Sequence, residues 1–368
     1  MNYIPLMSPN ITEQDIEAVV KVLRSGMLVQ GENVAELERE VSAYLGIRNV
    51  VAVSNGTATM HLALIALGIG VGDEVIVPAF SYVATANVVE IVGAKPVFVD
   101  VEPHTFNIDV AQIERAITPR TKAIIPVHEF GLACDISQLT KLAAAHGFVV
   151  IEDAACALGA SENGRFVGTF GKVGSFSLHP RKAVTSGEGG FLTTDDDDLA
   201  EQFRILRNHG IKMRDGKMDF VAAGFNYRMT DFQAALVRGQ FARLDDILAI
   251  RDTLASEYFE AASDVSPIVF PEIPENKRHT WQTFHAIVPD KMDRDAVIGK
   301  LKEKGIGSNY GAQCIPEQTI YKELYGLDSR ELFPNAMRAF KKGLALPLYE
   351  KLDRDDVRRV TAALAGLL

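Results

Sequence analysis

From about residue 49 to residue 208, short runs of β-branched and other apolar residues alternate with stretches of helical pattern. Such an alternation is typical of parallel strands joined by helical crossovers. The early strand candidates are apolar throughout, as expected for strands that helices cover on both faces. The sequence therefore predicts an α/β fold with a mostly parallel central sheet covered by helices.

Seven strands and five helices are expected in this region. The strand candidates are 49–53, 74–78, 96–101, 123–127 and 148–152, followed by a pair near 174–178 and 190–194. The helix candidates are 57–67, 81–92, 110–117, 136–146 and 199–208. The four aspartates at 195–198 are interpreted as the cap and first turn of the last helix, and not as a metal site.

The pattern changes after a helical stretch at 230–259, at the proline-containing segment 266–271. A smaller α+β unit is expected there, with a strand at 282–288 and helices at 294–304 and 353–367. We predict a large domain, residues 1–245, and a small C-terminal domain, residues 246–368. An alternative for the first residues is that they pack on the small domain.

Charge and cysteine content exclude several classes of partner. The formal net charge of -10 argues against a nucleic-acid-binding surface. No apolar stretch reaches the roughly 18 residues of a membrane span, and the first residues do not resemble an export signal, so we expect a cytoplasmic protein without a membrane partner. Three cysteines without metal-ligand spacing predict reduced thiols and no metal site.

Lys182 lies between the strand-like run 174–178 and the glycine-rich turn 187–190. This places it at the mouth of the sheet, where a desolvated amine can form a Schiff base with a carbonyl compound. Pyridoxal 5'-phosphate (PLP) is the obvious carbonyl cofactor. A single lysine is more often a solvated surface charge, so the assignment depends on its neighbours.

Two of those neighbours suit PLP. The turn at 54–58 lies between the first strand and its helix, where backbone N–H groups can bind a phosphate. Asp153 ends an apolar strand and can pair with a pyridine nitrogen, although a helix N-cap or a buried core carboxylate is the alternative. With Lys182, both can lie at the carboxyl ends of the strands, where open α/β sheets bind ligands.

Four further side chains are candidates for the same site. Tyr82 can stack on the cofactor ring or pack as a core aromatic residue. Ser177 can donate a hydroxyl to the phosphate or be an ordinary strand serine. Asn226 and Arg228 offer an amide and a fixed cation suited to phosphate, or belong to a loop before a helix.

The motifs together resemble the nucleotide-sugar aminotransferases of the DegT type, a branch of the fold-type I PLP enzymes. The resemblance covers nearly the whole chain in order. Its motifs are SNGTATMHLAL (54–64), PAFSYVATAN (78–87), PVHEFG (126–131), IEDAACALGA (151–160), SFSLHPRKAVTSGEGG (175–190), RNHG (207–210), GFNYRMTDFQAAL (224–236) and LALPLY (344–349).

The resemblance implies that Lys182 carries the cofactor and that Asp153 pairs with its ring nitrogen. It implies that Tyr82 stacks on the ring, and that Ser177 contributes a hydroxyl to the phosphate. Asn226 is implied to reach the phosphate from the neighbouring subunit, so that a homodimer shares its active sites.

The resemblance also implies that the backbone N–H groups of Thr57 and Ala58, next to Gly56, bind the phosphate. The chain departs from the family pattern at two places. Cys156 stands where many members have a glutamine that contacts the cofactor. Residues 309–313 read Asn-Tyr-Gly-Ala-Gln where many relatives carry a histidine, which implies an unusual sugar pocket.

The implied activity is PLP-dependent amino transfer from L-glutamate to a nucleotide-linked keto-sugar, in amino-sugar, surface polysaccharide or antibiotic biosynthesis. The opening residues 4–16 are most similar to members that aminate C4 of 4-keto-6-deoxy sugars. Residues that can shape the sugar pocket, or simply pack, are Trp281, His285, Asn309, Tyr310 and Gln313.

Three alternatives remain open. One is a pyridoxamine-dependent sugar dehydratase, although such relatives commonly replace the lysine by histidine. Another is a different fold-type I activity such as a lyase or cysteine desulfurase, for which Cys314 is the only late cysteine. The third is a catalytically silent regulatory relative, against which the intact Lys182 and Asp153 argue.

Overall fold

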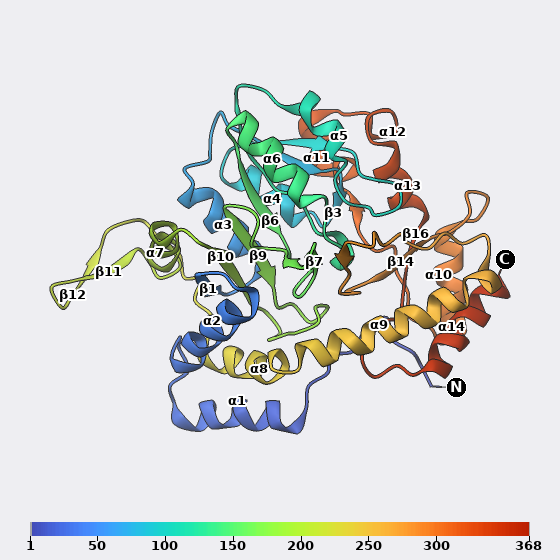
Figure 1. The fold of residues 1–368 in the computed structure, drawn as a ribbon, viewed down its shortest axis with the longest axis horizontal. Helices are drawn as coiled ribbons and strands as arrows, with labels where there is room; N and C mark the ends of the chain where they lie inside the picture. Colours follow the sequence, from blue (N-terminus) through green and yellow to red (C-terminus); the bar gives the residue numbers. More distant parts are fainter. Residues whose placement is uncertain (1, 368) are drawn as a thin grey trace.

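A seven-stranded sheet forms the centre of the computed structural model, which describes residues 2–367 (Figure 1). The strand order is β1-β10-β9-β6-β5-β2-β4. Strand β10 runs antiparallel to both of its neighbours and the other six strands are mutually parallel, so the predicted mostly parallel sheet is confirmed. The strands are β1 (Asn49–Val53), β2 (Glu74–Pro78), β4 (Lys95–Val99), β5 (Thr121–Ile124), β6 (Val149–Asp153), β9 (Val173–Ser177) and β10 (Gly190–Thr194).

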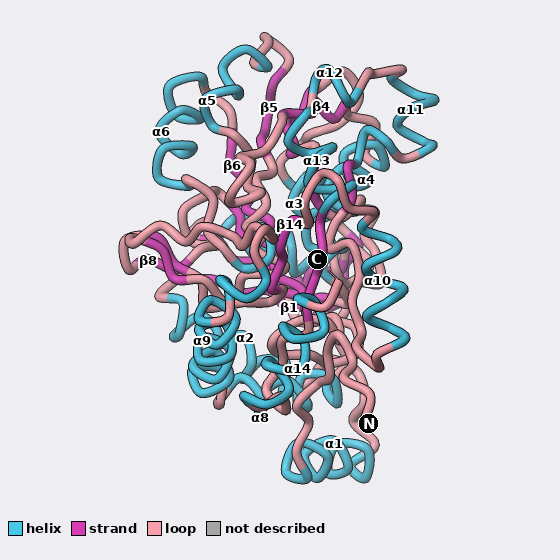
Figure 2. The backbone as a smooth tube through the Cα atoms, turned by 90° about the vertical axis from the view of Figure 1, so that its right-hand side faces the viewer, coloured by secondary structure: helices cyan, strands magenta, loops and turns pink. Residues whose placement is uncertain are grey.

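Helices cover both faces of this sheet. Successive residues of β2 point to opposite faces, as the pleat requires: Val75 and Val77 pack into one apolar cluster and Ile76 into another. Figure 2 shows α4 on one side of the sheet and α5 and α6 on the other. The helices of this part of the chain are α2 (Glu32–Leu45), α3 (Gly56–Ala66), α4 (Ala84–Ile91), α5 (Val110–Ile113), α6 (Ile136–His146), α7 (Asp197–Leu206) and α8 (Asp231–Phe241), the last of which packs against α2.

Strands β1, β2 and β10 have the predicted bounds, and the ends of the other four differ from prediction by one to three residues. The helix expected at 81–92 begins only at Ala84, because β3 (Phe80–Ser81) pairs with the distant β15 (Gln313–Cys314). The aspartate run behaves as predicted: Oδ1 of Asp196, the N-cap of α7, accepts the backbone N–H of Leu199 at 3.0 Å.

The C-terminal part has its own apolar cluster around the antiparallel pair β14 (Phe284–Ile287) and β16 (Gly343–Leu346). The long helix α9 (Leu244–Glu260) packs there against α14 (Arg354–Ala365). The start of the chain joins this part, because the Ile4 N–H donates to the Gly305 carbonyl at 2.9 Å. The division of the chain at residue 245 stays a prediction.

The remaining elements are short or peripheral. A hairpin of β11 and β12 projects from the body of the molecule next to α7 (Figure 1). These elements are α1 (Glu13–Ser25), β7 (Ser161–Glu162), β8 (Arg165–Phe166), β11 (Ile211–Arg214), β12 (Lys217–Phe220), β13 (Lys277–Arg278), α10 (Arg294–Glu303), α11 (Thr319–Tyr325), α12 (Ser329–Leu332) and α13 (Pro334–Lys342). None of the helices described within residues 2–367 is long and apolar enough to cross a membrane.

Candidate active site

The predicted site residues gather at the carboxyl edge of the sheet. Gly190, the first residue of β10, pairs with the last residue of β1 on one side and with Ser177 of β9 on the other. Strand β6 lies next to β9 and ends at Asp153. The strand order therefore places three features side by side along one edge of the sheet: the phosphate turn, Ser177 and Asp153. This is the edge where open α/β sheets bind ligands.

The phosphate turn is a tight junction between β1 and α3. A Cβ atom on Gly56 would lie 2.7 Å from the Ser177 Cβ, so only glycine permits this approach. The first backbone N–H groups of a helix have no partner within the helix and favour an anion. The Ala58 N–H, however, already donates to the N-cap side chain of Asn55 at 2.8 Å, which leaves Gly56 and Thr57 as the donors nearest the turn.

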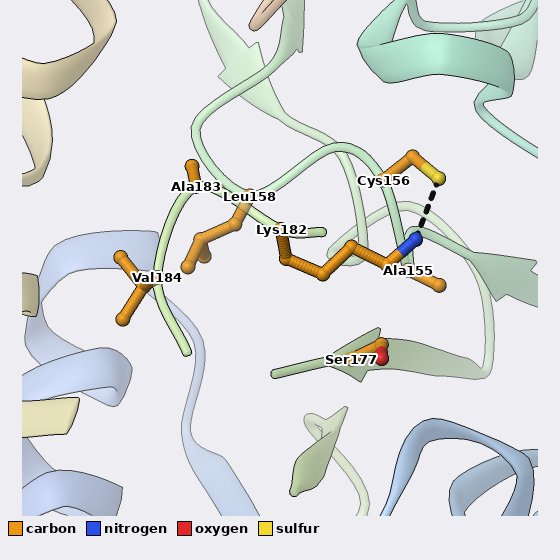
Figure 3. A pocket seen from close by; sticks show the side chains of 7 residues that line it. All are labelled: Ala155, Cys156, Leu158, Ser177, Lys182, Ala183 and Val184. Carbon is orange, nitrogen blue, oxygen red and sulfur yellow. Dashed lines mark hydrogen bonds between the residues drawn. The ribbon is translucent and has the colours of Figure 1, made fainter. Parts of the chain in front are cut away.

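Lys182 lies in a small pocket with two other predicted residues, Cys156 and Ser177 (Figure 3). Its Nζ lies 3.0 Å from the Cys156 Sγ. Burial raises the pKa of the Cys156 thiol, with the positive Lys182 acting in the opposite direction. A neutral sulfur is a weak hydrogen-bond acceptor, so it can hold the amine in place without trapping it in a salt bridge.

Asp153 is almost completely buried, with 4% of its surface exposed. Its Oδ2 accepts the Thr85 hydroxyl at 2.9 Å and its Oδ1 accepts the Ala155 N–H at 3.1 Å. Burial raises the pKa of this carboxyl, whereas these two donors and the nearby Lys182 lower it. A cationic ring nitrogen beside the carboxylate would stabilise its charged form in the same way.

The other predicted cofactor residues lie outside this pocket. Tyr82 follows β3 and is 66% exposed, so its ring faces solvent in the single chain. Asn226 is also exposed, on a segment that joins the end of β1 through the bond from the Ser54 N–H to the Tyr227 carbonyl. The Arg228 guanidinium already has a hydrogen-bond partner within the chain, because its Nη1 donates to the Asn208 Oδ1 at 2.6 Å.

The C-terminal candidates divide into core and surface residues. His285 is buried and stacks on Phe130 with ring centroids 4.4 Å apart, and burial lowers its pKa to about 3. It is therefore a neutral core residue, as is the buried Trp281, which stacks on His279. Gln313 Nε2 donates to the Tyr310 hydroxyl at 3.3 Å, next to β3.

Asn309 makes a backbone contact instead: its carbonyl accepts the Ala345 N–H at 2.8 Å.

Three further residues of the site were not predicted. Asn55 has a readable signal, since asparagine before a helix is a preferred N-cap. Thr85 and Glu129, a buried carboxyl beside the pocket, carry no local signal, because only the tertiary fold brings them to Asp153.

These residues fit PLP. The turn at Gly56 and Thr57 with the Ser177 hydroxyl could hold its phosphate, and Asp153 could hold its ring nitrogen. The Lys182 amine, in the pocket between them, could hold its carbonyl carbon. Within residues 2–367, no cluster of His, Cys, Asp and Glu side chains could hold a metal ion.

Residues 9–365 match the DegT/DnrJ/EryC1/StrS aminotransferase family. The chain is 36% identical over 380 residues to the spore coat polysaccharide biosynthesis protein SpsC of Bacillus subtilis, covering 100% of this chain and 97% of SpsC. It is 38% identical over 382 residues to the UDP-4-amino-4-deoxy-L-arabinose–oxoglutarate aminotransferase of Shewanella sediminis, covering 100% of this chain and 98% of that enzyme.

The solved structures agree. The sugar aminotransferase Spr1654 of Streptococcus pneumoniae, in its form with pyridoxamine phosphate, superposes with a TM-score of 0.93 at 32% identity and covers 99% of this chain and 97% of its own. Spr1654 has also been solved in its PLP form. The resemblance seen in the sequence is thus confirmed: the chain belongs to the DegT/DnrJ/EryC1/StrS aminotransferase family and is a PLP-dependent sugar aminotransferase.

Proposed function

We propose that this enzyme transfers the amino group of L-glutamate to a nucleotide-linked keto-sugar, with a 4-keto-6-deoxy sugar as the preferred acceptor. The observation that carries the proposal is the Lys182 amine, present and positioned against Cys156 in the electrostatic field of a buried Asp153. The name of the Shewanella sediminis relative contains a nucleotide sugar aminated at C4 and oxoglutarate, the keto acid that L-glutamate becomes. The name of SpsC adds support for a role in surface polysaccharide or related amino-sugar biosynthesis.

Bound PLP supplies an electrophilic carbonyl and a ring that withdraws electrons from the reacting carbon. The chain's residues then have distinct tasks. Lys182 would take the proton from the α-carbon of the donor and return it to the former carbonyl carbon of the cofactor, two bonds away, so it would serve as both base and acid. Asp153 would keep the ring nitrogen protonated, because a carboxylate beside the nitrogen stabilises its cationic form and is itself stabilised by that cation.

The remaining cofactor contacts position the ring. We assign phosphate binding to the Gly56 and Thr57 N–H groups with the Ser177 hydroxyl, and ring stacking to Tyr82. Asn226 is assigned to the phosphate of the neighbouring subunit. The three cysteines, all free, suit a reducing compartment such as the cytoplasm.

The acceptor is identified by product analysis. The PLP-loaded enzyme is incubated with L-glutamate and a panel of nucleotide-linked 3-keto and 4-keto sugars, and the products are analysed by mass spectrometry and NMR. We expect an amine at C4 of a 4-keto-6-deoxy sugar, with one 2-oxoglutarate formed per amine. A product that has lost a hydroxyl and gained no nitrogen would instead establish the dehydratase. Conversion of no sugar in the panel, with a visible spectrum unchanged by L-glutamate, would favour the silent relative.

We also propose a homodimer with shared active sites. The β11–β12 hairpin, which projects from the chain, carries exposed apolar side chains at Met213, Met218 and Phe220, and such patches mark protein interfaces. The test is subunit complementation between Lys182→Ala and Asn226→Ala chains, each inactive alone. Mixed dimers should regain activity, because one of their two sites then holds both side chains; mixed dimers without activity would contradict the shared site.

A further inference from the structure

Glu129 lies directly beside the candidate site, in a short turn after β5. The preceding residue, His128, donates its backbone N–H to the Asp153 carbonyl at 3.0 Å, so this turn runs along the end of β6. Phe130 has φ of 55°, in the left-handed region that a bulky aromatic residue rarely adopts. The rest of the fold therefore holds this turn in an unfavourable backbone conformation. Glu129 is the first residue of the turn.

The Glu129 carboxyl is buried and incompletely paired. The residue is 4% exposed, and among the described residues the Oε2 atom has no hydrogen-bond partner. Its pKa is raised to about 8, chiefly by burial and also by the negative Asp153, against the lowering effects of Ser81 and Lys182. At neutral pH the Glu129 carboxyl is thus mainly protonated, and its O–H can donate a hydrogen bond. Buried polar groups in proteins are nearly always hydrogen-bonded, so the unpaired oxygen indicates a missing partner.

The strand order decides on which side of the cofactor this donor lies. Ser177 and the phosphate turn follow β9 and β1, on one side of β6, whereas Glu129 follows β5, on the other side. A PLP ring held at its nitrogen by Asp153 and at its carbonyl carbon by Lys182 has two edges. One edge carries the phosphate arm and the other carries the phenolic oxygen. With the phosphate directed to the β9 side, the phenolic edge faces the β5 side.

We propose that Glu129 is a positioning residue that donates a hydrogen bond from its neutral carboxyl to the phenolic oxygen of bound PLP. This bond would fix the tilt of the ring about the axis between Asp153 and Lys182. The proposal depends on the cofactor alone, and not on the identity of the sugar.

The test compares PLP with 3-deoxypyridoxal 5'-phosphate, which lacks the phenolic oxygen. The full-length chain, freed of cofactor by dialysis, is titrated with each compound, and binding is followed by the fluorescence of Trp281, the single tryptophan. Trp281 follows Thr280, whose hydroxyl donates to the Cys156 carbonyl at 3.2 Å, so it reports on this site. Wild type should prefer PLP by on the order of three- to tenfold, the range of one net hydrogen bond.

Two variants isolate the hydrogen bond. Glu129→Gln keeps an N–H donor at nearly the same place and should keep the preference for PLP. Glu129→Met has similar length but no donor, and should show a smaller preference for PLP than wild type. Equal weakening of both compounds by Glu129→Met, with the preference unchanged, would overturn the proposal, because that is the result of a purely structural role.

A measurement on folded wild type alone covers the case in which Glu129→Met does not fold. An ionised carboxyl cannot donate, so the preference of wild type should decline between about pH 7 and about pH 9, across the raised pKa, while that of Glu129→Gln stays constant. The other titratable groups near Glu129, namely Asp153, Lys182 and Cys156, are present in both proteins and cancel in the comparison. Identical pH profiles would overturn the proposal. No sugar enters any arm, so a failed amination assay does not affect the outcome.

Discussion

The raised pKa of Glu129 predicts a pH dependence of stability that a single substitution should remove. The ordinary pKa of a glutamate, 4.5, applies to the unfolded chain, and burial raises it to about 8 in the folded chain. Between these values the folded chain binds a proton that the unfolded chain releases. The stabilisation from this proton is therefore complete below about pH 4.5, declines as the pH rises, and is lost above about pH 8.

The magnitude follows from the proton count. One proton bound only by the folded state changes the free energy of unfolding by about 1.4 kcal/mol per pH unit. Between about pH 5.5 and about pH 7.5, wild type should lose on the order of 2 to 3 kcal/mol that Glu129→Gln, which has no titrating group there, does not lose. Other groups titrate in both proteins, so the difference between the two isolates Glu129.

The assay is urea unfolding of the two cofactor-free proteins at both pH values and at equal protein concentration. Equal concentration keeps any contribution from chain association the same in both proteins. The quantity of interest is the wild-type free energy of unfolding minus that of Glu129→Gln, and it should fall as the pH rises. A difference that stays constant would show that Glu129 ionises normally in the folded chain. It would refute the inference that the buried Glu129 carboxyl is protonated at neutral pH and can donate a hydrogen bond.

Three further predictions test other parts of the site. Lys182→Ala should lower kcat by on the order of 10²- to 10⁴-fold, as expected for loss of a general base. Lys172→Ala, at the opposite end of β9 from Ser177, should retain activity; steady-state assays decide. Gly56→Ala should destabilise the protein by about 1–3 kcal/mol and weaken PLP binding, because its Cβ would press on Ser177; unchanged urea unfolding would contradict the tight turn. Phe220→Ser should shift dimers toward monomers in light scattering, and an unchanged mass would exclude the hairpin from the interface.

The sequence was most informative where structure depends on local pattern. Strands such as 49–53 and 190–194 are short apolar runs bounded by turn residues, and their bounds were predicted correctly. The start of α4 was predicted three residues too early, because Phe80 and Ser81 pair with a strand more than 200 residues away. No local pattern reveals such a partner.

The site residues divide in the same way, into those that local sequence pattern reveals and those that only the tertiary fold brings together. Lys182, Ser177 and Cys156 were predicted and do share one pocket, because the strands that precede them are neighbours in the sheet. The hydrogen bond of Ala58 to Asn55 was missed, although the N-cap preference of asparagine is readable from sequence. Thr85 and Glu129 were missed because their roles depend on burial against Asp153, which only the packed fold defines.

Three buried carboxylates at this edge of the sheet differ in how many donors the chain gives them. Glu152 accepts the N–H groups of Gly168, Phe170 and Gly171 at 2.6–2.7 Å, and lies 3.0 Å from the Nε2 of His128. His128 accepts a backbone N–H at its Nδ1, so its Nε2 carries the proton and donates to Glu152. The hydrogen-bonding capacity of Glu152 is thus filled within the protein, and its role is structural.

Asp153, the next residue of β6, points to the opposite face of the sheet and, within residues 2–367, its side chain has two donors, from Thr85 and Ala155. Lys182 is close enough to lower the pKa of this carboxyl, and we propose that a cationic ring nitrogen completes its set of partners. Glu129 has an oxygen without any partner in the described residues, beside the same pocket. The number of protein donors therefore separates Glu152, which has a full set, from Asp153 and Glu129, to which we assign cofactor contacts. This difference is the reason to test Glu129 together with Asp153 and Lys182.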